Sequence, residues 1–209
     1  DMWAFYRKVV RDFADEIRPN GGFTETAPFV GIDDFGFGEG SGPLAWGTVH
    51  PLLLWQLYQY YGDRLIIEEQ YEYAKRWLNL LERSSKDGIQ TQCIGDHESI
   101  AEKQVEVSAT AYYYLNARIM SKLAHVINNL QDAKKYEELS DEIAKKFKER
   151  FLNEDGKVGK GTQANQSLFL AFGMGSPDEN LKAQKILVED VKNHAGRLTT
   201  GIFGTKYLM

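Results

Sequence analysis

The sequence predicts an all-α protein of the α/α-toroid class, present as part of a ring of helical hairpins. Apolar residues recur at helical spacing along the chain, and no convincing run alternates with a period of two. Segments that are apolar nearly all round alternate with amphipathic segments at a drifting spacing of roughly 40–60 residues, which indicates stacked hairpins. A superhelical scaffold is the main alternative, although the unequal spacing and the lack of a repeated signature argue against a tetratricopeptide array.

The helices are predicted in the following order. The first runs from Trp3 to Ile17 with one apolar stripe, and Pro19-Asn20-Gly21-Gly22 ends it. Three later segments are apolar nearly all round, so we expect buried inner helices at about Val49–Tyr61, Val107–Asn128 and Gln163–Phe172. Each is followed by a helix with one charged side, expected in an outer layer, at about Leu65–Leu81, Asp132–Phe151 and Glu179–Asn193. A further helix is predicted to begin near Thr205.

The loops before the inner helices share one feature. The segments GPLAWGT, KQVEVSAT, DGKVGKGT and TGIFGT all end in a threonine at an inferred helix start, namely Thr48, Thr110, Thr162 and Thr205. A threonine there can cap free backbone N–H groups. In a toroid all inner helices run the same way, so these loops are expected to gather at one end and to face a common cleft.

A long loop, from Gly21 to Trp46, combines aromatic rings with carboxylates. Its aromatic residues are Phe23, Phe29, Phe35, Phe37 and Trp46, and its acids are Glu25, Asp33, Asp34 and Glu39. Such a mixture suits a sugar, whose C–H face stacks on aromatic rings while its hydroxyls need acceptors. Trp46 is therefore a candidate stacking platform, with a core anchor as the alternative. An aromatic-stapled surface loop is the alternative for the whole segment, and Asp33, Asp34 and Glu39 are either solvated acids or cation ligands.

Composition excludes several classes of function. The chain has 209 residues, 43% of them hydrophobic, and a formal charge of −5, so it can bury one core but lacks the basic excess of a nucleic-acid-binding protein. One cysteine and four scattered histidines predict no disulfide framework, no transition-metal site and no cofactor. The longest apolar run, near Pro51 to Leu57, is too short for a membrane span. We expect a soluble protein in the cytoplasm, the periplasm or outside the cell.

The strongest candidate for a functional carboxylate is Asp96, in the stretch Ile94-Gly95-Asp96-His97-Glu98 before the second inner helix. A carboxylate in a loop at this end is suited to sugar binding or to glycoside cleavage, although Asp96 can equally be a helix or turn cap. His97 is a candidate to hydrogen-bond a sugar hydroxyl, or it simply ends the turn. Cys93 is expected to be a small buried residue rather than a nucleophile.

The chain resembles the six-hairpin catalytic domain of bacterial α-L-rhamnosidases of glycoside hydrolase family 78. The resemblance rests on FYRKVVRDFADEIRPNGGFTETAP, AWGTVHPLLLWQLYQYYGD, the Gly95-Asp96-His97 loop, SATAYYYLNARIMSKLAHVINNLQDAKKYEELSDEIAKKFKERFL and RLTTGIFGTKYL, in this order. It implies that residues 1–209 are part of an (α/α)6 barrel. It also implies an inverting hydrolase that releases terminal α-L-rhamnose from glycosides or polysaccharides.

The resemblance also assigns site residues. The family usually has Trp-Gly-Asp where Trp46-Gly47-Thr48 stands, and Gly-Asp-Trp where Gly95-Asp96-His97 stands. Trp46 and Asp96 therefore take a sugar-site role from the resemblance, while Thr48 and His97 depart from it. By the same resemblance the general acid and the general base are expected outside this chain, and residues 1–209 alone are expected to be inactive.

The ends of the chain favour the same expectation. Its first residues already belong to a helical pattern, and it ends on the apolar Tyr207-Leu208-Met209, so we expect a part of a larger chain. The alternative function is a non-catalytic helical domain that binds carbohydrate or a protein partner and derives from this fold. A toroidal hydrolase or lyase acting on uronic-acid polysaccharides is a further alternative, for which these loops carry few basic residues.

Overall fold

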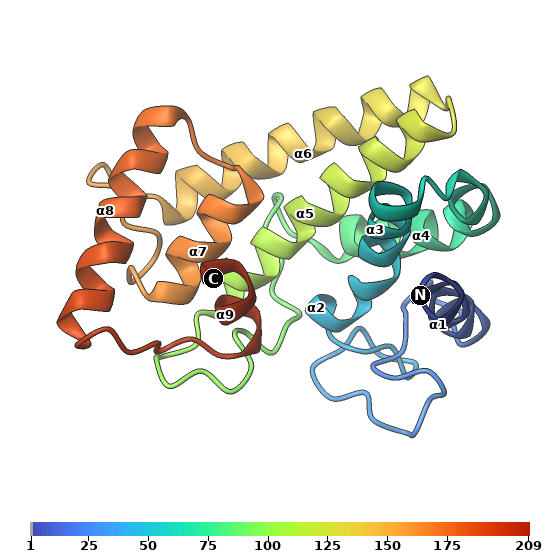
Figure 1. The fold of residues 1–209 in the computed structure, drawn as a ribbon, viewed down its shortest axis with the longest axis horizontal. Coiled ribbons are helices and arrows are strands. Elements are labelled where there is room, and N and C mark those ends of the chain that lie inside the picture. Colours follow the sequence, from blue (N-terminus) through green and yellow to red (C-terminus); the bar gives the residue numbers. More distant parts are fainter. Residues whose placement is uncertain (1) are drawn as a thin grey trace.

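The computed structural model describes residues 2–209, and these form nine helices with isolated β-bridges between a few loop residues (Figure 1). Asp1, the first residue of the predicted helical pattern, lies outside the described residues. The helices, in chain order, are α1 Trp3–Asp15, α2 Leu44–Gly47, α3 Val49–Tyr61, α4 Arg64–Ser84, α5 Val105–Val126, α6 Leu130–Phe151, α7 Gln163–Phe172, α8 Pro177–Asn193 and α9 Ile202–Leu208.

The helices form an inner and an outer layer around α5, as the sequence predicts. Helix α5 contacts α3 on one side and α7 on the other, and α7 contacts α9. The charged helices α4, α6 and α8 pack behind α3, α5 and α7 respectively, so each hairpin places one helix in each layer (Figure 1). Tyr112, Tyr113 and Tyr114 of α5 are all buried. The all-α prediction and the inner position of α5 are thereby confirmed.

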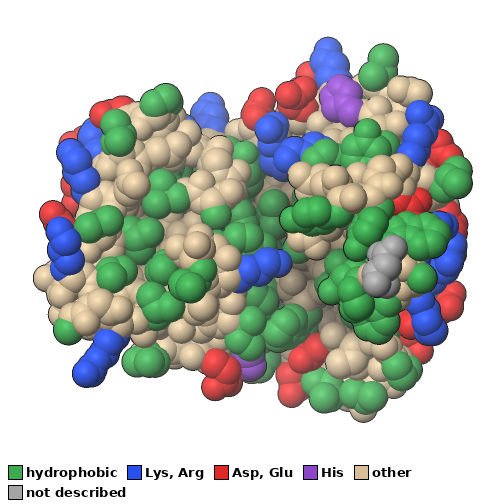
Figure 2. Space-filling model, viewed as in Figure 1, with side chains coloured by type: hydrophobic (Ala, Val, Ile, Leu, Met, Phe, Trp, Pro, Cys, Tyr) green, Lys and Arg blue, Asp and Glu red, His purple; other side chains and the backbone are tan. Residues whose placement is uncertain are grey.

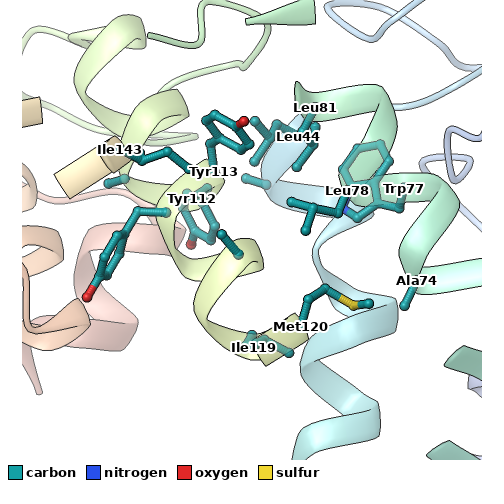
Figure 3. Close-up of a cluster of buried hydrophobic side chains, with 14 of the residues drawn as sticks. Leu44, Ala74, Trp77, Leu78, Leu81, Tyr112, Tyr113, Ile119, Met120 and Ile143 are labelled. Atoms are coloured by element: carbon teal, nitrogen blue, oxygen red, sulfur yellow. The ribbon is translucent and has the colours of Figure 1, made fainter. Parts of the chain in front are cut away.

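One part of the core lies where α2, α4 and α5 meet (Figure 3). Its buried side chains include Leu44 of α2, Trp77, Leu78 and Leu81 of α4, and Tyr113 of α5. Burying side chains of this size contributes about 1.5–3 kcal/mol each, so this junction is the main source of stability in this part of the molecule. It also sets the position of α2 and hence of the loop residues before α3.

One prediction about the helices needs correction, and one helix was not predicted. Helix α3 is not buried all round: Leu54 and Leu57 face the core, whereas Tyr60 is 78% exposed and Tyr61 46% exposed. The composition of α3 predicted burial, but the helices that pack on it within residues 2–209, chiefly α1, α4 and α5, leave its last turn exposed. The short helix α2 was not predicted, because four residues are too few to show a helical period.

Of the four threonines predicted as caps, one has this role. Thr162 accepts a hydrogen bond from the backbone N–H of Asn165 and caps α7. The hydroxyl of Thr48 instead donates to the carbonyl oxygen of Leu44, at 2.8 Å. Thr110 and Thr205 lie inside α5 and α9, which begin earlier than predicted. The prediction failed because a helix start depends on backbone angles that a single residue type does not determine.

The segments before the inner helices nevertheless gather at one end, at the lower edge of Figure 1. The backbone N–H of Leu44 in α2 lies 3.4 Å from the carbonyl oxygen of Gln92, and the N–H of Lys160, before α7, donates to the side chain of Gln104. Figure 2, in the same view, shows a hollow lined mainly by hydrophobic side chains between the two halves of the molecule. Among residues 2–209, no helix has the length and apolar character needed to cross a membrane.

Candidate functional site

The site is built from two loop segments that are joined by backbone hydrogen bonds. Residues 85–104, between α4 and α5, contain Asp96 and His97, and residues 194–201 lead into α9. The N–H groups of Ile100 and Ala101 both donate to the carbonyl oxygen of Thr199, at 3.1 Å. The N–H of Ile202 donates to the carbonyl oxygen of His97, at 2.8 Å. The two segments therefore hold each other in place although about a hundred residues separate them.

Asp96 caps helix α9 from this loop. Its Oδ2 accepts a hydrogen bond from the N–H of Gly201 at 2.6 Å, and its Oδ1 accepts from the N–H groups of Phe203 and Gly204 at 3.0 and 2.9 Å. The side chain is buried, and the whole residue is only 3% exposed. The first N–H groups of a helix have no partner within the helix, and a negative charge beside them is favourable. Of the two interpretations of Asp96, the geometry shows the helix cap directly.

Trp46 and His97 lie together beside this cap. Their ring centroids are 6.0 Å apart in an edge-to-face arrangement, and the other side of Trp46 meets the ring of Phe203, with centroids 5.0 Å apart. Phe203 in turn packs edge-to-face on Tyr112 of α5, at 5.4 Å. Trp46 is partly buried rather than sealed in the core. An amphipathic ring in such a place can offer a face to a ligand while its edges hold it still.

A pocket of about 480 Å³ opens next to His97. Its walls combine apolar residues with five ionisable ones, and they are formed by Glu25, Ile32, Asp34, Phe35, Cys93, Ile94, His97, Lys103 and Val105. Partial burial raises the pKa of Glu25 above its ordinary value; the charge of Asp34 adds to the increase, and His97 opposes it. This pocket offers carboxylates, an imidazole and an ammonium group beside apolar walls, which suits a polyhydroxylated ligand with a C–H face.

The predicted site residues Trp46, Asp96 and His97 thus lie at the same end of the fold, but their side chains do not face the same surface. His97 lines the pocket and contacts Trp46, whereas the carboxylate of Asp96 turns inward to α9. Of the loop acids, Asp34 lines the pocket, and Glu39 accepts a hydrogen bond from the N–H of Asn20. The thiol of Cys93 is buried and its pKa is raised by that burial, so it is a packing residue as predicted.

Three residues in or beside the pocket were not predicted as site residues from the sequence. Glu25 was one of several acids in the long loop. The residues next to it in the sequence do not indicate that its side chain is partly buried near Asp34. Lys103 is an exposed lysine in a polar loop, which carries no signal of its own. Phe203 could have been predicted as a buried residue near the site, because it lies two residues after Gly201 in an apolar segment that was expected to start an inner helix. Its contact with Trp46 joins residues 157 positions apart along the chain.

The side chains around the pocket do not form a metal-binding group. No group of three or more His, Cys, Asp or Glu side chains is placed to hold a metal ion in the described part of the chain. The polar groups around the pocket are suited instead to hydrogen bonding with hydroxyls. A carboxylate accepts from a hydroxyl, an imidazole can accept or donate, and an ammonium group donates.

The comparisons with known proteins agree along the whole chain. The model of the bacterial alpha-L-rhamnosidase 6 hairpin glycosidase domain matches residues 1–209. An alpha-L-rhamnosidase of Streptomyces avermitilis is 31% identical over 98% of this chain, and one of Formosa agariphila is 28% identical over all of it. These matches span 19% and 23% of the two relatives, so the chain spans about a fifth of their length.

Solved structures show the same relationship. The alpha-L-rhamnosidase of Dictyoglumus thermophilum superposes with a TM-score of 0.88 at 31% identity, covering 100% of this chain and 24% of that one. The Streptomyces avermitilis alpha-L-rhamnosidase, solved as a complex with L-rhamnose, gives a TM-score of 0.88 at 29% identity, covering 99% of this chain and 20% of that one. Together with the hairpin layers and the shared loop end, these findings show that the chain belongs to the bacterial α-L-rhamnosidase six-hairpin glycosidase domain family.

Proposed function

We propose that residues 1–209 form part of the (α/α)6 catalytic domain of a glycoside hydrolase that releases terminal α-L-rhamnose from glycosides or polysaccharides. The observation that carries the proposal is the pocket beside His97, at the end of the fold where the inner helices begin, in a chain that matches the rhamnosidase domain model throughout. Similarity to a structure that holds L-rhamnose supports the choice of sugar.

In this proposal the chain supplies a wall of the sugar site. Trp46 offers a ring for the C–H face of the sugar, and His97 exchanges hydrogen bonds with its hydroxyls. Asp96 belongs to the same wall, since it immediately precedes His97 and holds the helix that supports Trp46. The general acid and general base of an inverting mechanism, which stand about 6.5–9.5 Å apart to admit a water molecule, are expected outside these residues.

The test is the binding of L-rhamnose to the complete polypeptide that carries these residues. Trp46→Ala is expected to weaken binding by about 1–3 kcal/mol, because that is the scale of removing one large apolar contact. Trp55→Ala is the matched control, since Trp55 lies on α3 against Tyr58 and Lys122, whereas Trp46 contacts the pocket residue His97. Titration calorimetry gives both affinities. Equal affinities for the two variants would contradict a sugar contact at Trp46.

A second candidate is a non-catalytic carbohydrate-binding domain derived from the same fold. It is favoured by Thr48 and His97, which stand where the family usually has an aspartate and a tryptophan. Thr48 is buried with its hydroxyl bonded to backbone, so it does not replace a carboxylate in the pocket. Turnover of an aryl α-L-rhamnoside by the complete polypeptide separates the candidates: the hydrolase turns it over, and the binding domain holds L-rhamnose without turnover.

A further inference from the structure

The carboxylate of Asp96 is bonded to the first turn of α9. Three backbone N–H groups, those of Gly201, Phe203 and Gly204, lie 2.6–3.0 Å from its two oxygens. The residue is 3% exposed, and it is absent from the pocket lining, where Glu25 and Asp34 are the acids. An acid that binds a sugar hydroxyl directly needs an oxygen open to the site, which this arrangement does not provide.

The two glycines of α9's first turn show how closely the segments approach. A Cβ atom on Gly204 would lie 2.6 Å from Oδ2 of Asp96, and one on Gly201 would lie 1.9 Å from the carbonyl oxygen of His97. Neither contact is compatible with a side chain at its present place. The sequence Gly201-Ile202-Phe203-Gly204 therefore lets the helix start come within hydrogen-bonding distance of the Asp96 loop.

The helix that Asp96 holds supports the aromatic wall of the site. The N–H of Phe203 is bonded to Oδ1, and the ring of the same residue is wedged between Trp46 and Tyr112, with centroids 5.0 and 5.4 Å away. On its other side Asp96 is followed directly by His97, whose ring meets Trp46 at 6.0 Å. The ring of His97, which lines the pocket, and the ring of Trp46, which contacts His97, are thus each one contact removed from this carboxylate.

We infer that Asp96 is a positioning residue, which fixes Trp46 and His97 through the backbone of residues 201–204 and does not itself contact the sugar. The sugar-binding part of this inference rests on the proposed function, whereas the positioning part concerns only contacts within the chain. Loss of the carboxylate releases the start of α9, Phe203 moves with it, and the ring of Trp46 loses its support.

Two variants of the complete polypeptide test the inference. Asp96→Asn keeps the shape but presents an NH₂ group to one of the N–H donors. Gly204→Ala keeps the carboxylate but crowds it, together with Thr200 and Ala164, and so pushes the helix start away from these neighbours. Asp15→Asn, at the exposed end of α1, is the charge-matched control. We expect Asp96→Asn and Gly204→Ala each to speed amide hydrogen exchange at residues 201–204 roughly 10- to 100-fold, the scale of losing charge-assisted hydrogen bonds, and the control to leave it unchanged.

Two further readouts separate positioning from direct contact. In both variants the indole N–H signal of Trp46, identified by Trp46→Phe, is expected to shift in NMR spectra, and the KM for an aryl α-L-rhamnoside to rise by similar factors with kcat little changed. A loss of affinity in Asp96→Asn with normal affinity and altered exchange in Gly204→Ala would overturn the inference and make Asp96 a sugar ligand. Unchanged exchange and an unshifted Trp46 signal in Asp96→Asn would also overturn it. If no variant, nor the parent, binds L-rhamnose, the proposed function fails while exchange and the Trp46 signal still decide the positioning role.

Discussion

His50, near the start of α3, is a fully buried histidine with one hydrogen-bonded nitrogen. Its Nε2 lies 3.2 Å from Oε1 of Gln70, which assigns the proton to Nε2, and its ring stacks on Phe23 with centroids 4.3 Å apart. Its Nδ1 has no hydrogen-bond partner. Burial lowers the pKa of His50 to about 4, and the bond to Gln70 opposes that decrease only partly. The folded protein therefore holds this imidazole neutral.

This predicts a loss of stability in mild acid. The unfolded chain takes up a proton at His50 near its ordinary pKa of 6.5, whereas the folded chain does so only near 4, so the free energy of unfolding falls as the pH drops from 6.5 to 4. The decrease attributable to His50 is roughly 3 kcal/mol over this window. Urea unfolding at pH 7 and pH 4.5 measures it. His50→Gln should flatten the profile, whereas His125→Gln, an exposed control, should keep it; equal profiles for all three would contradict the prediction.

Glu25 and Asp34 predict a second titration effect, in the pocket. Partial burial raises the pKa of Glu25, the neighbouring charge of Asp34 raises it further, and His97 lowers it. Asp34→Asn should therefore move the pKa of Glu25 back towards its ordinary value, and His97→Gln should move it up. Carbon-13 NMR of the Glu25 carboxyl follows both changes. A shift in the same direction in both variants would show that the two side chains do not act on Glu25 through their charges.

At the scale of elements, Asn116 of α5 joins three helical segments by buried hydrogen bonds. Its Oδ1 accepts from Nε1 of Trp77 in α4 at 3.0 Å, and its Nδ2 donates to the hydroxyl of Thr48, between α2 and α3, at 2.8 Å. The same Nδ2 donates to the carbonyl oxygen of Tyr112, one turn earlier in α5, at 2.8 Å. Asn116 and Thr48 are both buried, so this network fixes how α2 and α3 sit against the central hairpin.

Asn116→Ala should therefore destabilise the fold by about 2–3 kcal/mol, because the indole N–H of Trp77 loses its partner and a polar cavity remains. Asn193→Ala, at the exposed end of α8, should change stability by less than about 0.5 kcal/mol. The midpoints of urea unfolding compare the two. A destabilisation of equal size in both variants would indicate that the network contributes no more than an ordinary surface asparagine.

At the scale of the whole molecule, residues 1–209 bring the loops before α3, α5, α7 and α9 to one end and leave a hollow there (Figure 2). The carboxylate of Asp96, the strongest candidate acid in these loops, accepts hydrogen bonds from three backbone N–H groups. An inverting glycosidase needs two free carboxyl groups on opposite sides of the scissile bond. Glu25 and Asp34 also line the pocket, so the proposal that these residues form a wall of a sugar site rests on the match to the family model as well as on this geometry.

We therefore expect residues 1–209, expressed alone, to give no measurable turnover of an aryl α-L-rhamnoside, and the complete polypeptide to hydrolyse it. In the proposed function the acid and the base both lie outside these residues, and loss of each costs about 10²–10⁴-fold, so no readily detectable rate is expected. Both proteins are assayed side by side at equal molar concentration. Robust turnover by residues 1–209 that disappears in Asp96→Asn would assign the catalysis to Asp96 and overturn this expectation.

The fold class and most of the helices could be predicted from the amino-acid sequence. The predicted spans Val49–Tyr61 and Gln163–Phe172 agree with α3 and α7 residue for residue, because each is closed by a glycine in the left-handed conformation, Gly62 or Gly173. The alternation of apolar and charged helices predicted the two layers, since a helix that is apolar on most sides is stable only between neighbours. The quoted segments were sufficient for the family, and the sugar-site roles given to Trp46, Asp96 and His97 stay predictions.

The contacts of individual side chains, in contrast, could not be predicted without the folded chain. Asp96 could be a cap or a sugar ligand, and the choice depends on α9, more than a hundred residues away along the chain. The partial burial of Glu25 beside Asp34 and the support of Trp46 by Phe203 depend in the same way on segments that meet only in the folded chain. Local sequence carries helical period and turn chemistry, which are properties of neighbours. Burial, charge proximity and hydrogen-bond partners between distant segments arise only when the hairpins pack.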